Sequence, residues 1–108
     1  ANVLIQNSSE EFWQPVKSNL KLTIYRILQE LMTNMKKHSN ANVVVISFKK
    51  EENYLQIQYT DNGKGFNLRD LKFSNGIKNI EARVAHLSGY LDFKETEKGM
   101  VIILKFRV

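Results

Sequence analysis

One long amphipathic helix limits the folds open to this chain. Residues 19–37 carry apolar side chains at helical spacing: Leu20, Ile24, Ile27, Leu28, Leu31 and Met35. At about 100° per residue these side chains form one stripe, which must be buried against another element. Glu30, Asn34 and Lys37 form a polar stripe roughly a quarter-turn away, at the margin of the core where a cleft can open. The alternative interpretation is a solvated helix face with a Glu–Lys pair.

Segments of alternating polarity predict the sheet on which this helix packs. Strands are expected at residues 3–6, 43–49, 54–60, 90–96 and 100–108. A second amphipathic helix is predicted over residues 79–87, with Gly89 as its terminator, and residues 8–15 are expected to be a connection. The expected fold is an α/β (α+β) two-layer sandwich, in which helices cover one face of a mixed sheet.

Composition agrees with one folded domain spanning residues 1–108. A chain of 108 residues buries roughly two-thirds of its unfolded surface. No apolar run approaches the roughly 20 residues that span a bilayer, and the first residues do not resemble a signal peptide, so we expect no membrane contact in this domain. The absence of cysteine excludes disulfides and fits a cytoplasmic location. The net charge of +5 suits a polyanionic ligand, and it suits nucleic acid or an acidic partner equally.

The segment DNGKGF, residues 61–66, puts a carboxylate and two glycines at a turn after a predicted strand. Glycine allows the backbone to approach a flat ligand closely. A carboxylate held at such a turn can accept a hydrogen bond from an amino group, such as the exocyclic amine of adenine. The pattern D-x-G-x-G also occurs in ordinary turns, so it needs a second element to be specific.

The long helix supplies that element, as Glu30-x-x-x-Asn34-x-x-Lys37-His38. Together the helix and the turn resemble the ATP-binding domain of sensor histidine kinases, whose fold is shared with DNA gyrase, the heat-shock ATPase chaperone and the MutL repair proteins. The helix is similar to the family's N-box, and DNGKGF to its first glycine box. The segments SNGIKNIEAR and GMVIIL are similar to the second glycine box and the final box. The resemblance covers roughly residues 20–108 and is nearest to the subgroup with N-x-x-K-H and G-x-K-N-I-x-x-R.

This resemblance implies a Bergerat-type ATP-binding fold with ATP and Mg²⁺ as cofactors. Asn34 would supply the amide oxygen that binds Mg²⁺. Asp61 would take the adenine amino group, while Gly63 and Gly65 admit the base and the ribose. Glu30 would be the catalytic residue, either orienting the attacking imidazole or supporting Asn34.

The resemblance also implies a set of phosphate contacts. Lys37 would meet phosphate, and His38 would do the same or pack at the helix end. Gly76 and the backbone amides after it, at a helix N-terminus, would hold phosphate, with Lys78 and Asn79 as further candidates.

The implied function is that of an ATP-dependent protein histidine kinase in two-component signal transduction. The γ-phosphate would pass to a histidine on a separate dimerisation domain and then to a response-regulator aspartate. Neither His38 nor His86 is expected to be the acceptor, because that histidine belongs to another domain in the family. The chain would then be excised from a longer sensor kinase, whose membrane anchoring stays open.

Three alternatives remain at the sequence level. One is an anti-sigma-factor type of serine kinase, against which the N-x-x-K-H and K-N-I-x-x-R motifs argue. Another is a nucleotide-binding module of the same fold without turnover. The third is a basic nucleic-acid-binding domain, which the dispersed lysines and arginines disfavour.

Two residues depart from the family pattern. Ser74 replaces the first glycine of the second box, and Met100 replaces the threonine that usually follows the final glycine. These departures reduce the expectation of full activity more than the expectation of nucleotide binding.

Overall fold

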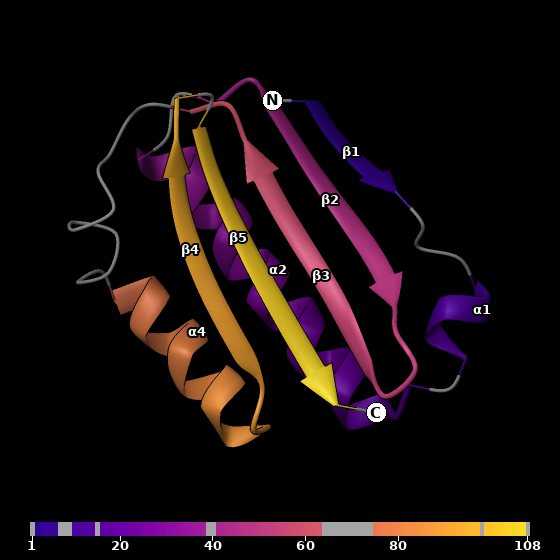
Figure 1. The fold of residues 1–108 in the computed structure, drawn as a ribbon. Helices are drawn as coiled ribbons and strands as arrows, with labels where there is room; N and C mark the ends of the chain where they lie inside the picture. The colour runs from indigo at the N-terminus through magenta and orange to yellow at the C-terminus, as the bar shows by residue number, and fades with distance from the viewer. Residues whose placement is uncertain are drawn as a thin grey trace.

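The chain forms a five-stranded sheet with its two longer helices on one face (Figure 1). The computed structural model describes residues 2–6, 10–14, 16–38, 41–63, 75–97 and 99–107. The strands are β1 (Asn2–Gln6), β2 (Val43–Lys50), β3 (Tyr54–Asp61), β4 (Tyr90–Thr96) and β5 (Gly99–Arg107). The helices are α1 (Glu10–Trp13), α2 (Ser18–His38) and α4 (Asn75–His86).

The sheet is mixed, with strand order β1-β2-β3-β5-β4. β1 pairs with β2 in parallel, and the other neighbouring strands are antiparallel. Figure 1 shows α2 crossing behind the sheet, α4 beside the β4 edge and α1 at the other side of the molecule, below β1. The predicted two-layer arrangement is therefore confirmed.

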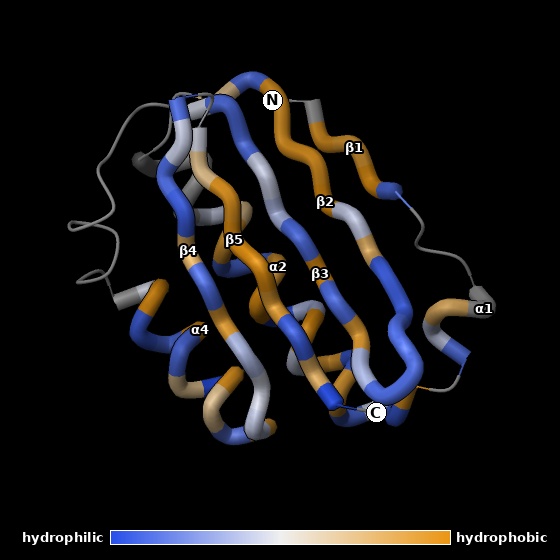
Figure 2. The backbone as a smooth tube through the Cα atoms, viewed as in Figure 1, coloured by the Kyte–Doolittle hydropathy of each residue, from blue (hydrophilic) through white to orange (hydrophobic). Residues whose placement is uncertain are grey.

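Alternation along the strands divides the sheet into a buried face and an open face. In β2, β3 and β5 every second side chain is buried, as period-two strands with one covered face require. The helices fill the layer behind them with apolar residues: Ile24, Ile27 and Leu31 from α2, and Ile77, Ile80 and Val84 from α4. Figure 2 shows apolar residues gathered in β1, the first half of β2 and the middle of β5. The predicted apolar stripe of the long helix therefore lines the core.

The short helix α1 replaces the connection expected at residues 8–15. Phe12 is buried, and its ring meets the rings of Trp13 and Phe48 edge-on, at centroid distances of 4.9 and 5.3 Å. Such edge-to-face pairs favour one fixed arrangement of the rings. Because Phe48 lies on β2, far along the chain, local sequence carried no signal for this helix.

The second helix begins earlier and ends differently from the prediction. α4 starts at Asn75, four residues before the predicted start at Asn79. At its end, the N–H of Gly89 donates to the carbonyl of Val84 at 2.9 Å, and Ser88 adopts a left-handed φ of 53°. This is a Schellman cap in which Ser88, not Gly89, takes the left-handed position.

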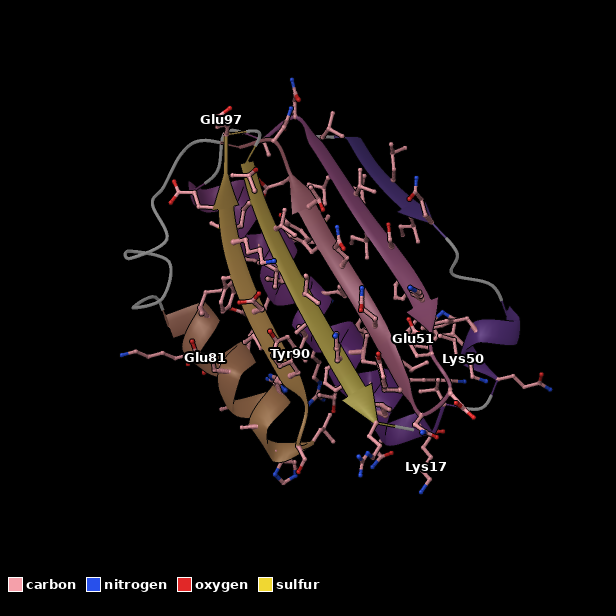
Figure 3. All side chains as sticks on the ribbon, in the orientation of Figure 1. Lys17, Lys50, Glu51, Glu81, Tyr90 and Glu97 are labelled. Atoms are coloured by element: carbon pink, nitrogen blue, oxygen red, sulfur yellow. The ribbon has the colours of Figure 1, made fainter. Side chains whose placement is uncertain are left out.

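The open face of the sheet carries an aromatic–cation cluster. The Lys105 ammonium lies 5.5 Å from the ring centre of Tyr54 and 5.4 Å from that of Tyr90. Tyr90 is labelled in Figure 3.

Within the described residues, no helix is long and apolar enough to cross a membrane.

Candidate functional site

A single carboxylate lies in the core at the end of a central strand. Asp61 is the last residue of β3 and continues the buried alternation of Leu55, Ile57 and Tyr59. Its side chain is only 5% exposed, and it is the only charged residue that is buried among those the structure describes. Charged groups are rarely buried without a partner, so this placement requires an explanation.

Two hydrogen bonds hold the Asp61 carboxylate, one on each oxygen. The hydroxyl of Tyr59 donates to Oδ2 at 2.8 Å, and the backbone N–H of Gly63 donates to Oδ1 at 3.0 Å. An ionised carboxylate has about four acceptor positions, and the donors among the described residues occupy one position on each oxygen. The group is therefore fixed in orientation and still able to receive a donor from a ligand.

Burial raises the pKa of Tyr59 far above the ordinary value of a phenol, and the charge of Asp61 and the hydrogen bond to it act in the same direction. If Tyr59 ionised, its phenolate would lie against the negatively charged Asp61 carboxylate, and the hydrogen bond between them would be lost. The Tyr59 hydroxyl is therefore a hydrogen-bond donor throughout the neutral pH range.

This pKa shift predicts a specific loss of stability at alkaline pH. Above about pH 10 the unfolded chain releases the Tyr59 proton, while the folded chain keeps it. The free energy of unfolding then falls as pH rises, by up to about 1.4 kcal/mol per pH unit from this group. Below about pH 10 the full stabilising contribution of Tyr59 is present. Tyr59→Phe lacks this dependence. Urea unfolding of both proteins should show a stability difference that is constant from about pH 7 to 9 and shrinks towards about pH 11. A difference that stays constant across the alkaline range contradicts the prediction.

Asn62 ties the turn after β3 to the start of β2. Its side-chain Oδ1 accepts from the backbone N–H groups of Asn42 and Val43, at 2.9 and 3.1 Å. Its own backbone N–H donates to the Val43 carbonyl at 3.3 Å. The turn that carries the carboxylate is therefore fastened to the strand that follows the long helix.

Gly99 packs directly against the backbone of this turn. Its φ is +136°, which L side chains rarely adopt, and a Cβ added there would lie 1.9 Å from the Asp61 carbonyl oxygen. The next residue, Met100, pairs with Asp61 across β3 and β5 and is buried. The departure from threonine at position 100 therefore puts an apolar side chain next to the carboxylate.

The predicted residues of the long helix lie in the second half of α2. Glu30 is half-buried. Asn34, Lys37 and His38 lie in the last turns of the helix, and their side chains lie outside the described part of the structure. In Figure 1 this end of α2 and the C-terminal end of β3 lie at the same end of the sheet. Figure 3 labels Glu97 at that end of the strands, whereas Lys50 and Glu51 lie at the opposite end.

The predicted phosphate contacts lie at the beginning of α4. Gly76, Lys78 and Asn79 belong to its first turns, and the side chains of Lys78 and Asn79 are exposed. No acidic residue occupies the first turn of this helix. α4 contacts α2 behind the sheet, so both helices border the same layer. Gly65 and Ser74 lie outside the described residues.

Sequence reasoning missed the residues that position the carboxylate. Tyr59 has the pattern of an ordinary apolar position of an alternating strand. Gly99 was assigned to the final box, but its contact with the backbone of Asp61 was not predicted. The available signal for Tyr59 was the Tyr-x-Asp spacing, because residues two apart in a strand share a face. Across the described residues, no group of three or more histidine, aspartate or glutamate side chains could hold a metal.

The sequence of the chain matches the model of one protein family. A model of the histidine kinase-, DNA gyrase B- and HSP90-like ATPases matches residues 19–108. Sensor protein VraS of Staphylococcus epidermidis is 41% identical over 66 residues, which are 59% of this chain and 19% of that protein. Sensor protein VraS of Staphylococcus haemolyticus is 37% identical over 65 residues, with the same coverage. The chain thus spans about a fifth of the length of these curated relatives.

Solved structures share the fold. The blue-light activated histidine kinase of Erythrobacter litoralis EL346 gives a TM-score of 0.80 at 18% identity, over 97% of this chain and 34% of that chain. The catalytic domain of histidine kinase ThkA, in a nucleotide free form, gives a TM-score of 0.74 at 13% identity, over 98% of this chain and 78% of that chain. At these identities the likeness concerns the fold, a mixed sheet with helices on one face.

Proposed function

Because the chain belongs to the histidine kinase-, DNA gyrase B- and HSP90-like ATPase family, we propose that it is the ATP-binding catalytic domain of a longer sensor histidine kinase. It would bind ATP with Mg²⁺ and present the γ-phosphate to a histidine on a separate dimerisation domain. A response regulator would then receive the phosphoryl group. This chemistry would take place in the cytoplasm, where ATP is available. The motifs N-x-x-K-H and K-N-I-x-x-R favour this reading over a serine kinase of the anti-sigma-factor type.

The observation that carries the proposal is the buried Asp61 carboxylate. Tyr59 and Gly63 hold it, and these donors from the described residues take up one acceptor position on each oxygen. An acceptor pair of this kind recognises an amine donor, and adenine presents one at its six-position. Guanine presents a carbonyl there, which a carboxylate repels. A carboxylate can also accept from the N1–H and the two-amino group of guanine, so the preference for adenine rests on the resemblance of residues 61–66 to the first glycine box of the family.

The start of α4 supports the proposed phosphate contacts. The first N–H groups of a helix lack partners within the helix, and its N-terminal end carries a partial positive charge. Gly76 allows close approach there, and the exposed Lys78 adds a positive charge. With an overall net charge of +5, the chain is suited to a triphosphate.

Residues of α2 would complete the reaction site. Mg²⁺ prefers oxygen ligands, and when bound it neutralises charge on the transferring phosphoryl group. Asn34 would contribute an amide oxygen to it, and Lys37 and His38 would approach the phosphates. Glu30 would orient the attacking imidazole or support Asn34. Catalysis by these groups would consist mainly of positioning and charge stabilisation.

A nucleotide-binding module without turnover is the second candidate. The observation that favours it is Met100, which is buried beside Asp61 where the family usually has threonine. The two candidates differ in phosphoryl transfer and agree in nucleotide binding.

We expect ATP with Mg²⁺ to stabilise the fold by mass action. At about ten times the dissociation constant, a ligand adds about 1.4 kcal/mol, which raises the melting temperature of a domain this size by roughly 6–11 °C. A thermal-shift titration compares ATP, GTP and ATP with a chelator. GTP should give little or no shift, and chelation should reduce the shift given by ATP.

An equal shift with GTP contradicts the adenine assignment. Transfer is tested separately, by adding the dimerisation domain of the same parent and γ-labelled ATP. An acid-labile, base-stable label on that domain supports the kinase. Nucleotide binding without any label favours the module without turnover.

A further inference from the structure

We propose that Tyr59 is a positioning residue for base recognition: its hydroxyl fixes the Asp61 carboxylate in the orientation that receives the amino group of adenine. The proposal rests on the function proposed above, and it adds a residue that no motif assigns. It also predicts which part of nucleotide affinity depends on this hydroxyl.

The geometry of β3 places the hydroxyl on the carboxylate. Tyr59 and Asp61 are two residues apart in the strand, so their side chains leave the same face. The distance from the Tyr59 hydroxyl to Oδ2 of Asp61 is 2.8 Å, typical of a strong bond to a charged acceptor. Both side chains are almost fully buried, at 2% and 5% exposure. Water is therefore a poor substitute for this hydrogen bond.

The two bonds on the carboxylate have different consequences. Rotation of an aspartate about its last torsion is soft, because carboxylates do not favour sharp rotamers there. The Gly63 N–H restrains only Oδ1, and it belongs to the turn itself. Tyr59 restrains Oδ2 from inside the core, where its ring is anchored among apolar neighbours. With both oxygens fixed, the remaining acceptor positions keep one direction.

Filling the core at this position does not require the hydroxyl. The preceding buried positions of the strand, Leu55 and Ile57, are apolar, and a phenylalanine ring would fill the space of Tyr59. A buried hydroxyl costs free energy unless it is hydrogen-bonded. The chain therefore carries a polar atom in its core whose observed partner is the carboxylate of the candidate site.

The test is Tyr59→Phe, with binding of ADP and inosine diphosphate measured by calorimetry. Inosine diphosphate has the ribose and phosphates of ADP and a carbonyl in place of the six-amino group. Loss of the hydroxyl should weaken ADP binding roughly five- to twentyfold and change inosine diphosphate binding less than about twofold. The preference for ADP over inosine diphosphate should fall by the same factor as ADP affinity.

Tyr54→Phe is the matched control. It removes a hydroxyl from the same strand on the opposite face of the sheet, so ADP and inosine diphosphate binding should both stay unchanged. A reduced folded fraction in Tyr59→Phe would lower both affinities by one common factor. The ratio of the two affinities is independent of that fraction, and an osmolyte such as trimethylamine oxide restores folding if needed.

The outcomes separate this inference from the proposed function. Equal weakening of both nucleotides by Tyr59→Phe overturns the positioning role, because a general structural effect explains it. Unchanged ADP binding in Tyr59→Phe, together with weak ADP binding in Asp61→Asn, overturns the role of Tyr59 and leaves the adenine assignment standing. If Asp61→Asn also binds ADP normally, the adenine assignment and the inference both fail.

Discussion

Gly99→Ala should abolish nucleotide binding and strongly destabilise the fold. The added methyl group would lie 1.9 Å from the Asp61 carbonyl oxygen and 2.8 Å from the Asn62 Cα, and both are backbone atoms that cannot rotate away. The φ of +136° adds strain of its own. Overpacking and strain together cost about 2–5 kcal/mol, or roughly 10–30 °C of melting temperature. Circular dichroism melts and calorimetry with ADP at low temperature measure the two effects.

Gly89→Ala is the matched control for this prediction. A Cβ at Gly89 would lie 2.9 Å from the Lys105 carbonyl oxygen and 3.0 Å from the Phe106 ring, so it also destabilises. It lies in the cap of α4, remote from the turn after β3, and folded protein should keep its ADP affinity. A Gly99→Ala protein that is folded and binds ADP normally would refute the proposed role of this backbone contact.

Asp61→Asn should have the second large effect, a loss of adenine recognition. Asparagine offers one oxygen for the two donors that Asp61 satisfies, and its amide N–H groups face the amine of the base. A hydrogen bond to a charged group contributes about 1.5–3 kcal/mol, so ADP affinity should fall roughly 10- to 100-fold. Inosine diphosphate should not bind more weakly, because an amide N–H can donate to its carbonyl. Calorimetry of both nucleotides measures this exchange of preference.

Asn34→Ala is the comparison variant for that experiment. Asn34 is proposed to hold Mg²⁺, so its removal should leave metal-free ADP binding largely intact and reduce the gain that magnesium gives. If the two variants behaved identically with and without magnesium, the assignment of base recognition to Asp61 and of metal binding to Asn34 would be wrong.

The fold was largely predictable because periodicity is a local signal. Alternation in β2, β3 and β5 and the stripe of α2 each follow from residues close in sequence. Helix α1 was missed because it depends on Phe48, which reaches Phe12 only in the folded chain. At the end of α4, propensity favoured glycine in the left-handed position, and the structure puts Ser88 there. Gly89 is needed instead for its close approach to β5.

The motifs of the candidate site were predictable from the sequence, but the residues that hold Asp61 and its turn in place were not. Asp61 and Gly63 stand out because the turn D-x-G-x-G occurs together with the helix motif that contains Glu30, Asn34, Lys37 and His38. Tyr59 looks like a core residue, and only its hydrogen bond reveals a second use. Asn62 looks like a solvated turn residue, and only the folded structure brings it to Asn42 and Val43. The roles of Asn34, Lys37 and His38 remain predictions.

The contact between Gly99 and Asp61 also bears on how the chain avoids misfolding. A one-residue slip of β5 against β3 would turn apolar side chains to the open face, so alternation alone forbids it. A slip of two residues keeps every side chain on its proper face, and alternation cannot reject it. Such a slip would bring a residue other than glycine, Val101 in one direction, against the Asp61 carbonyl. We therefore expect the missing side chain at position 99 to favour the observed pairing of the two central strands over a slip of two residues.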